Sequence, residues 1–264
     1  MSDAPPTTDL DIPALENALA QRLIGRRIHH YDKIGSTMDE ARRLALQGVA
    51  EGTIVIAEEQ TAGRGRFNRV WVSPRGENLS FSVILTPTAS QLPYMNMAAT
   101  LAVARTVAAD AGLKPTIKWP NDVRVGGLKI SGILIETAVE NENAVCAIIG
   151  VGVNVNFDPS LHPEIADIST SLYRETGRRR SRTSVLRMLL EYFGDAYAAV
   201  RAGNSLTTEW AEMLDTLGRT ISLRSQYDTI TGVAEAVDER GSLLVRRADG
   251  SLLTATAGEV TSQL

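Results

Sequence analysis

Residues 118–136 read Lys-Trp-Pro-Asn-Asp-Val-Arg-Val-Gly-Gly-Leu-Lys-Ile-Ser-Gly-Ile-Leu-Ile-Glu, and this stretch decides the fold prediction. Its second half, residues 128–136, has the apolar character of a buried strand. A second apolar run, residues 144–156, follows the polar residues 140–143. This order of two long strands around a short polar turn predicts an antiparallel hairpin inside a larger sheet.

The same stretch also concentrates reactive side chains. Lys118 and Lys129 are two of the few lysines in a chain whose 27 cationic residues are mostly arginine. They lie on either side of Asn121 and Asp122, which follow Pro120. Asn-Asp after proline is also ordinary turn chemistry, so a purely structural interpretation stays open. The clustering of two lysines with an aspartate nevertheless favours a functional site.

Glycine-rich segments lie on both sides of this stretch. Residues 59–71 read Glu-Gln-Thr-Ala-Gly-Arg-Gly-Arg-Phe-Asn-Arg-Val-Trp. Glycine lets the backbone approach a ligand and arginine reaches oxyanions, although an ordinary surface loop explains the segment equally well. Residues 150–156 read Gly-Val-Gly-Val-Asn-Val-Asn. Glycines within an apolar strand indicate that another group packs against the backbone, or that the sheet bends there.

The rest of the chain predicts an α/β body with a β-rich tail. Helices are expected at residues 12–23, 37–47, 92–110, 183–201 and 207–214, and further strands at 53–57, 79–85 and 115–119. Thr37 with Glu40 three residues later resembles a capping box. Short apolar pieces at 220–223, 231–237, 243–245 and 252–256, separated by turn residues, predict a small appended β-barrel.

Composition excludes several classes of protein. With 44% apolar and 22% charged residues the chain is not disordered, and its net charge of −4 argues against a globally basic nucleic-acid binder. A single cysteine, Cys146, excludes an intramolecular disulfide and favours a reducing compartment. No apolar run is long enough for a membrane span, so we expect a cytoplasmic protein without membrane contact. The basic residues 178–182 are interpreted as a solvated loop, and His29-His30 as structural rather than metal-binding.

Taken together and in this order, the motifs resemble those of the biotin protein ligases. Gly-Arg-Gly-Arg at 63–66, Lys-Trp-Pro-Asn-Asp at 118–122, Lys-x-x-Gly-Ile-Leu-x-Glu at 129–136 and Gly-x-Gly-x-Asn-x-Asn at 150–156 carry the resemblance, which covers residues 28–156. It implies an α+β fold with a mixed-sheet catalytic domain like that of class II aminoacyl-tRNA synthetases, and a small C-terminal SH3-like β-barrel. The implied division is an N-terminal leader and helix at 1–25, a catalytic domain at 26–217 and the β domain at 218–264.

The resemblance implies an enzyme that makes biotinyl-5′-AMP from biotin and ATP with Mg²⁺. The biotin would then pass to one lysine of the biotin carboxyl carrier protein of acetyl-CoA carboxylase or of a related carboxylase. The stretch before Ser36 is short for a DNA-binding module, so we expect no DNA binding. A homodimer is possible.

The resemblance also implies roles for individual residues. The biotin contacts would be Ser36, Thr37, Met38, Gln60, Gly63, Arg64, Gly65, Arg66, Lys129 and Gly132. The ATP contacts would be Arg69, Trp71, Lys118, Asn121, Asp122 and Asn154. The catalytic groups would be Arg66, Lys129, Lys118 and Asp122, with Asp122 also binding the metal ion and steering the acceptor lysine.

The chemistry of the reaction supports such a set of cations. Two unit charges about 4 Å apart repel by about 4 kcal/mol at an effective dielectric constant of about 20, and here a carboxylate must meet a triphosphate. Two positions depart from the family pattern. Met38 stands where asparagine is common, and Asn68 replaces a second glycine of the loop.

Three rival functions remain open from the sequence. A lipoate ligase or octanoyltransferase would share the catalytic fold, but those families lack the Gly-Arg-Gly-Arg loop as it stands here. A non-catalytic biotin sensor would keep the pocket without needing both Lys118 and Lys129. An RNA-binding protein could use the Arg-Gly loop, but the acidic net charge and 5% aromatic content argue against it.

Overall fold

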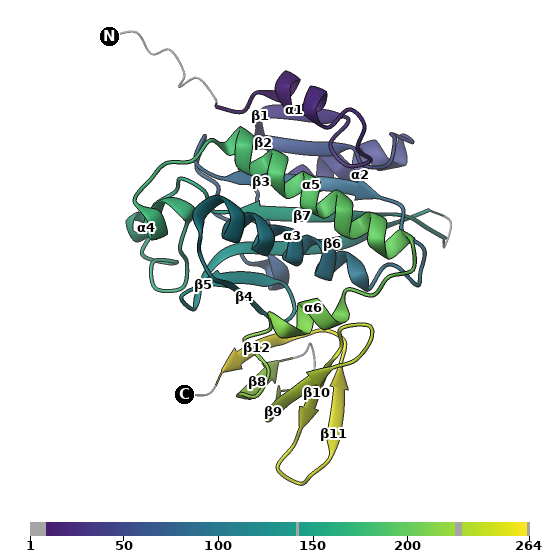
Figure 1. The fold of residues 1–264 in the computed structure, drawn as a ribbon, viewed down its shortest axis with the longest axis vertical. Coiled ribbons are helices and arrows are strands. Elements are labelled where there is room, and N and C mark those ends of the chain that lie inside the picture. The colour runs from purple at the N-terminus through teal and green to yellow at the C-terminus, as the bar shows by residue number, and fades with distance from the viewer. Residues whose placement is uncertain (1–8, 141–142, 225–228, 263–264) are drawn as a thin grey trace.

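The computed structural model describes residues 9–140, 143–224 and 229–262. They form a seven-stranded sheet followed in the chain by a five-stranded sheet. Figure 1 shows helices packed on the larger sheet and the smaller sheet lying beyond the last helix. The predicted α+β class, with a mixed sheet and a small C-terminal β domain, is confirmed. Residues 1–8 of the predicted leader lie outside the described residues.

The larger sheet has the strand order β1-β2-β3-β7-β6-β5-β4. Its strands are β1 (Ile28–Ile34), β2 (Ile54–Gln60), β3 (Leu79–Leu85), β4 (Pro115–Lys118), β5 (Asp122–Val125), β6 (Leu128–Glu140) and β7 (Asn143–Val153). β1 and β2 are parallel, and the other neighbours are antiparallel. The predicted hairpin is confirmed, because β6 and β7 pair up to Glu140 and Asn143; its turn residues 141–142 lie outside the described residues.

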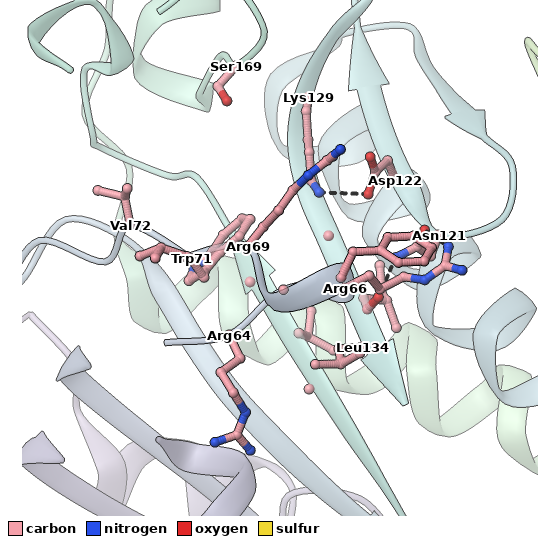
Figure 2. Close-up of a pocket in the computed structure, with 18 of the residues that line it drawn as sticks. Arg64, Arg66, Arg69, Trp71, Val72, Asn121, Asp122, Lys129, Leu134 and Ser169 are labelled. Carbon is pink, nitrogen blue, oxygen red and sulfur yellow. Dashed lines mark hydrogen bonds and ion pairs between the residues drawn. The ribbon is translucent and has the colours of Figure 1, made fainter. Parts of the chain in front are cut away.

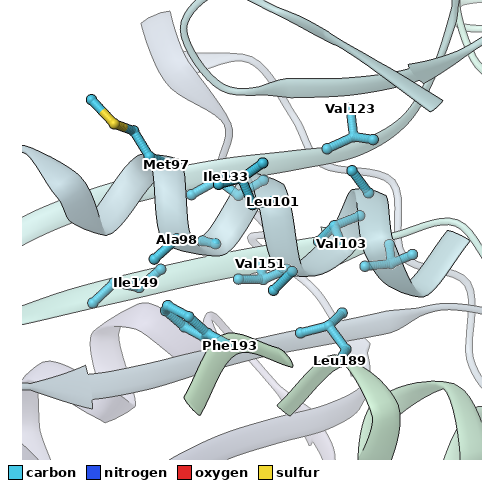
Figure 3. Packing of buried hydrophobic residues seen from close by; sticks show 14 of the residues in the cluster. Met97, Ala98, Leu101, Val103, Val123, Ile133, Ile149, Val151, Leu189 and Phe193 are labelled. Atoms are coloured by element: carbon cyan, nitrogen blue, oxygen red, sulfur yellow. The ribbon is translucent and has the colours of Figure 1, made fainter. Parts of the chain in front are cut away.

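Helices cover both faces of this sheet. They are α1 (Ile12–Ala18), α2 (Thr37–Leu46), α3 (Tyr94–Ala111), α4 (Leu172–Thr176), α5 (Arg182–Arg201) and α6 (Thr207–Glu212), with 3₁₀ turns at Arg66–Asn68 and Pro159–Leu161. α3 and α5 pack on one face, where Leu101 and Phe193 meet Ile133 and Val151 (Figure 3). α2 packs on the other face, where Met38 joins the second apolar cluster. No helix within the described ranges is long and apolar enough to cross a membrane.

Alternation along the strands explains how one sheet serves two apolar layers. Ile54 and Ile56 face the layer of α3 and α5, whereas Val55 between them belongs to the layer of α2. Successive strand side chains point to opposite faces, so an almost continuous apolar run fits a strand buried on both sides. The run at residues 53–57 therefore predicts a central strand, as found.

The smaller sheet has the order β11-β10-β9-β8-β12 and is antiparallel. Its strands are β8 (Thr220–Arg224), β9 (Thr229–Val237), β10 (Leu243–Arg246), β11 (Leu252–Ala255) and β12 (Glu259–Ser262). It contacts the body where the Trp119 indole Nε1 donates to the carbonyl oxygen of Gly241 at 2.9 Å. Gly241 has a φ of 78°, and a Cβ there would lie 2.5 Å from the Met97 methyl group. The β domain is thus packed directly against the larger sheet and its helices.

Two local predictions were wrong. The helix expected at residues 12–23 ends at Ala18, because the chain turns there to let the Gly25 amide bond the Gly52 carbonyl at 2.9 Å. The expected capping box at Thr37 is absent: Ser36 is the N-cap, and no side chain caps the helix. The Thr37 hydroxyl instead bonds side chains of the sheet, so tertiary partners replace the local cap.

Four elements were not predicted. They are β1, β5, α4 and β12. β5 was not predicted because its first residue, Asp122, belongs to a Pro-Asn-Asp sequence, which is typical of turns. β1 contains His29, His30 and Asp32, a polar composition that an edge strand tolerates.

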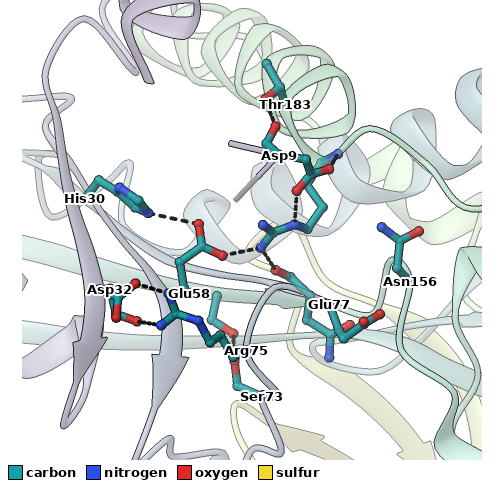
Figure 4. Close-up of polar contacts among 12 residues, drawn as sticks. Asp9, His30, Asp32, Glu58, Ser73, Arg75, Glu77, Asn156 and Thr183 are labelled. Carbon is teal, nitrogen blue, oxygen red and sulfur yellow. Dashed lines mark hydrogen bonds and ion pairs between the residues drawn. The ribbon is translucent and has the colours of Figure 1, made fainter. Parts of the chain in front are cut away.

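A buried ion network joins the N-terminal segment to the sheet (Figure 4). Arg182, at the start of α5, and Glu58, on β2, have side chains only 1% exposed, and the guanidinium lies 2.8 Å from the carboxylate. Arg182 also donates to Asp9 at 2.5 Å, and His30 Nε2 lies 3.0 Å from Glu58. Both charges are therefore desolvated and matched by neighbours, which is the condition under which buried charges are tolerated.

Candidate active site

A cavity of about 860 Å³ opens between the larger sheet, the Gly-Arg loop and the edge of the β domain. All of the residues predicted to bind biotin or ATP line it, except Gly63. Gly63 lies just outside: a Cβ there would come 2.7 Å from the Trp71 carbonyl oxygen, so glycine is needed for the close return of the loop. The structure therefore gathers residues from positions 36 to 154 around one space (Figure 2).

One part of the cavity lining is neutral and polar. The Gln60 side-chain oxygen accepts hydrogen bonds from the Thr37 amide at 2.9 Å and from the Thr37 hydroxyl at 3.1 Å. The same hydroxyl lies 2.9 Å from the Ser82 hydroxyl, and Ser36 and Thr37 are buried. A rigid set of hydroxyl and amide groups of this kind matches a neutral ligand with both donors and acceptors.

The strand glycines make room for side chains that form the cavity. A Cβ at Gly152 would lie 2.3 Å from the Trp71 indole, and one at Gly150 would lie 2.7 Å from the Met38 sulfur. A Cβ at Gly132 would lie 2.8 Å from the Lys129 ammonium nitrogen. The prediction that other groups pack against the strand glycines is confirmed.

The Gly-Arg loop is tied to three different parts of the molecule. Arg64 makes a two-pronged ion pair with Asp39 on α2, with both N–O distances 2.7 Å, and this lowers the pKa of the Asp39 carboxyl. Arg66 donates to the Asn121 side-chain oxygen at 3.0 Å, and Arg69 pairs with Glu259 of the β domain. In Figure 2 the Arg64 guanidinium points away from Lys129 and Arg66.

Another part of the cavity lining is cationic, with Arg66, Lys118 and Lys129. The Lys129 ammonium lies 2.7 Å from the Asp122 carboxylate. Burial lowers the pKa of Arg66. Burial, followed by the positive charge of Arg124, also lowers the pKa of Lys118. These cations lie in a partly desolvated cavity. They would therefore attract an anionic ligand more strongly there than they would in bulk water.

The cavity contains residues that sequence reasoning missed. They are Arg124, Ile168, Ser169 and Glu259, among others. Arg124 could have been found if β5 had been recognised, since residues two apart on a strand share a face. No local signal indicates that Glu259, far along the chain, folds back onto the cavity.

Metal binding was tested against the side chains present. Among the described residues, no group of three or more His, Cys, Asp or Glu side chains could hold a metal ion. Asp122 offers a single carboxylate in the cavity, and it already faces Lys129. One carboxylate suits a magnesium ion that takes its remaining ligands from substrate phosphates and water, which is how Mg²⁺ is commonly bound.

The basic residues 178–182 are largely taken up by ion pairs. Arg179 pairs with Glu77 at 3.0 Å, Arg180 with Asp110 at 3.4 Å and Arg182 with Glu58 at 2.8 Å. These arginines hold the start of α5 against the sheet. This segment therefore supports the fold.

Comparison with known proteins agrees with the cavity. Residues 32–154 match the Biotin/lipoate A/B protein ligase family, and residues 216–261 match the Biotin protein ligase C terminal domain. The chain is 34% identical over 237 residues to the bifunctional ligase/repressor BirA of Bacillus subtilis, covering 88% of this chain and 73% of that relative. The chain belongs to the biotin protein ligase family.

Another relative and a solved structure support this membership. The biotin–[acetyl-CoA-carboxylase] ligase of Paracoccus denitrificans is 32% identical over 224 residues, which are 80% of this chain and 90% of that one. The biotin protein ligase of Aquifex aeolicus, solved in complex with biotin and ATP, superposes with a TM-score of 0.76 at 28% identity, covering 90% of this chain and 99% of that chain. The match to the C-terminal domain of biotin protein ligases argues against the lipoate alternative.

Proposed function

We propose that this protein is an ATP-dependent biotin protein ligase. It forms biotinyl-5′-AMP from biotin and ATP, and then transfers biotin to a lysine of a carboxylase carrier domain. The observation that carries the proposal is the cavity itself, whose lining combines the neutral polar groups of Thr37 and Gln60 with the cations Arg66, Lys118 and Lys129. A ligand with a neutral ring system and a carboxylate, meeting a triphosphate, fits these two sets of groups.

In the first step an oxygen of the biotin carboxylate forms a bond to the α-phosphorus of ATP. The bond from that phosphorus to the bridging oxygen breaks, and pyrophosphate leaves. Arg66 and Lys129 would flank the two reacting anions, and Lys118 would face the phosphates. Such groups accelerate the reaction because they are already oriented toward charge that grows in the transition state.

In the second step the ε-amine of the carrier lysine attacks the acyl carbon, and AMP leaves as the amide forms. The amine must lose a proton, and the Asp122 carboxylate, which lines the cavity beside Lys129, would orient the amine. This carboxylate lies 2.7 Å from the Lys129 ammonium, and its oxygens can also accept a hydrogen bond from the amine.

The remaining predicted contacts follow from the same arrangement. Ser36, Thr37 and Gln60 would bind the ureido ring. Met38 would form an apolar part of the cavity wall, and Gly132 would leave space beside it for the ligand. Trp71, packed on Gly152, would lie against the adenine, near Asn154. A magnesium ion would enter with ATP and take one oxygen from Asp122, where it would neutralise phosphate charge.

The proposed partner is a carrier domain of acetyl-CoA carboxylase or of a related carboxylase. The proposed location is the cytoplasm, because the reaction consumes ATP and the chain has a single cysteine. The lysine to be modified must reach Asp122 and Lys129 through the open side of the cavity, so the acceptor must present it on an exposed turn.

The test is an incubation with ATP, Mg²⁺, biotin and a carrier domain, followed by mass spectrometry of the carrier. We expect a mass gain of one biotin, and no gain when lipoate replaces biotin. Arg66→Ala and Lys129→Ala should each lower pyrophosphate release at least about 100-fold, which corresponds to about 2.7 kcal/mol. An unmodified carrier, or near-normal pyrophosphate release by both variants, would contradict the proposal.

A further inference from the structure

The cavity contains a cation, Arg124, to which neither the sequence nor the family resemblance assigns a role. Arg124 lies on β5 and lines the cavity together with Asp122 and Lys118. In the pairing of β4 with β5, Arg124 is opposite Thr116, and Asp122 is opposite Lys118. Arg124 and Lys118 are therefore diagonal neighbours on one face of the sheet, a relation that puts Cα atoms about 7–8 Å apart.

The two cations are poorly matched by acidic groups. The Arg124 guanidinium reaches its nearest carboxylate, Asp215, at 3.9 Å, which is too long for a hydrogen bond. That carboxylate accepts a hydrogen bond from the Thr116 hydroxyl at 3.0 Å. The Arg124 Nε is buried without a hydrogen-bond partner. For the Lys118 ammonium, no hydrogen bond or ion pair occurs within residues 9–140, 143–224 and 229–262.

Lys129 provides the contrast within the same cavity. Its ammonium lies 2.7 Å from Asp122, so its charge is matched before any ligand binds. Lys118 and Arg124 instead repel each other in a half-buried place, and this repulsion contributes to the lowered pKa of Lys118. Such a pair is stabilised when an anion carrying at least two charges binds between its members.

We propose that Arg124, together with Lys118, binds the β- and γ-phosphates of ATP and the pyrophosphate that leaves. This inference rests on the proposed function, and it divides the cations into two groups. Arg66 and Lys129 serve the α-phosphate and the carboxylate, whereas Arg124 and Lys118 serve the leaving group. The planar guanidinium of Arg124 can hold two phosphate oxygens at once, which an ammonium group cannot.

The test compares ligands with and without the two terminal phosphates. The variant is Arg124→Gln, and the probes are AMP and α,β-methylene-ATP, an analogue that cannot be cleaved at the reacting bond. We expect the analogue to bind at least about tenfold more weakly, as for the loss of one charge-assisted hydrogen bond, with AMP and biotin affinities unchanged within about twofold. Inhibition by pyrophosphate should weaken by the same factor.

Arg105→Gln is the matched control. Arg105 also pairs with a carboxylate, that of Glu209, but it lies on α3 outside the cavity. This control variant should bind all four ligands as the unchanged protein does. Arg124→Lys serves as a second variant if Arg124→Gln does not fold, and it should still weaken the analogue more than AMP.

Two results would overturn the inference: unchanged binding of the analogue, or an equal loss for the analogue and AMP, since the latter indicates a general distortion. The proposed function is tested separately by pyrophosphate release from ATP and biotin in the unchanged protein. If that release were absent while the selective loss at Arg124 occurred, the ligase function would fail and the phosphate site would stand. If pyrophosphate release were normal and Arg124→Gln caused no selective loss of analogue binding, the ligase function would stand and the phosphate site would fail.

Discussion

Gly152 shows how one missing side chain shapes the cavity. The Trp71 indole occupies the space that a Cβ at this position would need, at a distance of 2.3 Å. The indole is rigid and is also held by a hydrogen bond from Nε1 to the hydroxyl of Ser80, the residue paired with Gly152 on the neighbouring strand, at 3.3 Å. A methyl group at residue 152 must therefore displace the ring as a whole.

We predict that Gly152→Ala raises the KM for ATP at least about tenfold, while overpacking costs about 1–3 kcal/mol of unfolding free energy. Steady-state kinetics and urea unfolding measure the two effects. Gly194→Ala is the control, because no atom lies within 4 Å of its Cβ position in α5. That substitution should leave the KM unchanged and stabilise the protein by about 1 kcal/mol, as alanine does within a helix. An unchanged KM for ATP in Gly152→Ala would contradict the proposed contact between Trp71 and the nucleotide.

Lys118 makes the enzyme sensitive to alkaline pH. Its pKa is lowered from the ordinary value of 10.5, first by burial and then by Arg124. As the pH rises through this lowered pKa, the ammonium loses its proton and one positive charge disappears from the phosphate site. We predict that kcat/KM for ATP falls in a range of pH below 10.5.

Kinetics at a series of alkaline pH values measure this effect, because kcat/KM reports the ionisation of the free enzyme. Lys118→Arg should move the decline to higher pH, since arginine keeps its proton up to about pH 12. If kcat/KM declined at the same pH in the unchanged protein and in Lys118→Arg, the decline would be caused by the ionisation of another group.

At the scale of elements, side-chain contacts attach the Gly-Arg loop to several neighbouring segments, including the hydrogen bond from Arg66 to Asn121. The Arg64–Asp39 pair attaches it to α2 and the Arg69–Glu259 pair attaches it to β12. Both pairs are partly exposed, and exposed pairs contribute only about 0–1 kcal/mol each. Attachments of this strength allow the loop to open, and we expect it to close when biotin supplies further contacts.

We predict that biotin protects residues 63–76 from limited proteolysis. If biotin binds the closed loop, protection should reach about tenfold at a biotin concentration ten times the Kd. Gel analysis of cleavage products measures the rate, and cleavage near Asn204, after α5, serves as an internal reference. Equal rates at residues 63–76 with and without biotin would show that the loop does not close on the ligand.

At the scale of the whole molecule, distant segments are joined through buried polar contacts. The pair of Arg182 and Glu58 connects α5 to β2, and Asp9 adds the N-terminal segment. Asn78 continues the network toward the cavity, since its side-chain nitrogen lies 3.2 Å from the Asn154 oxygen. The polar contacts that stabilise the fold thus continue to Asn154, a residue that lines the cavity.

We predict that Arg182→Met lowers the free energy of unfolding by about 3–5 kcal/mol, because it leaves the Glu58 carboxylate buried without this charge partner. Urea unfolding measures the change. The double variant Arg182→Met, Glu58→Met should recover much of the loss, since apolar side chains of similar size tolerate burial. A loss below about 1 kcal/mol in the single variant would mean that water reaches the carboxylate.

Patterns of short range account for the elements that were predicted correctly. Apolar alternation predicts β3, the Ala-rich run with Gly112 after it predicts α3, and the polar interruption predicts the β6–β7 hairpin. Each depends on interactions between near neighbours in the chain, so the sequence pattern carries enough information. The capping box expected at Thr37 was wrong and the strand β5 was missed, because both depend on partners elsewhere in the chain.

The sequence by itself determined the class of fold and the chemical groups of the site, because strand periodicity, glycine placement and side-chain charge are properties of individual segments. Only the tertiary structure decided which cations face acidic partners and which do not. Arg64 is matched by Asp39 and Lys129 by Asp122, both at 2.7 Å, whereas the nearest carboxylate to Arg124 among the described residues, that of Asp215, lies 3.9 Å away. Electrostatic pairing depends on distances through space, and strands β4, β5 and β6 set those distances only once the sheet has formed.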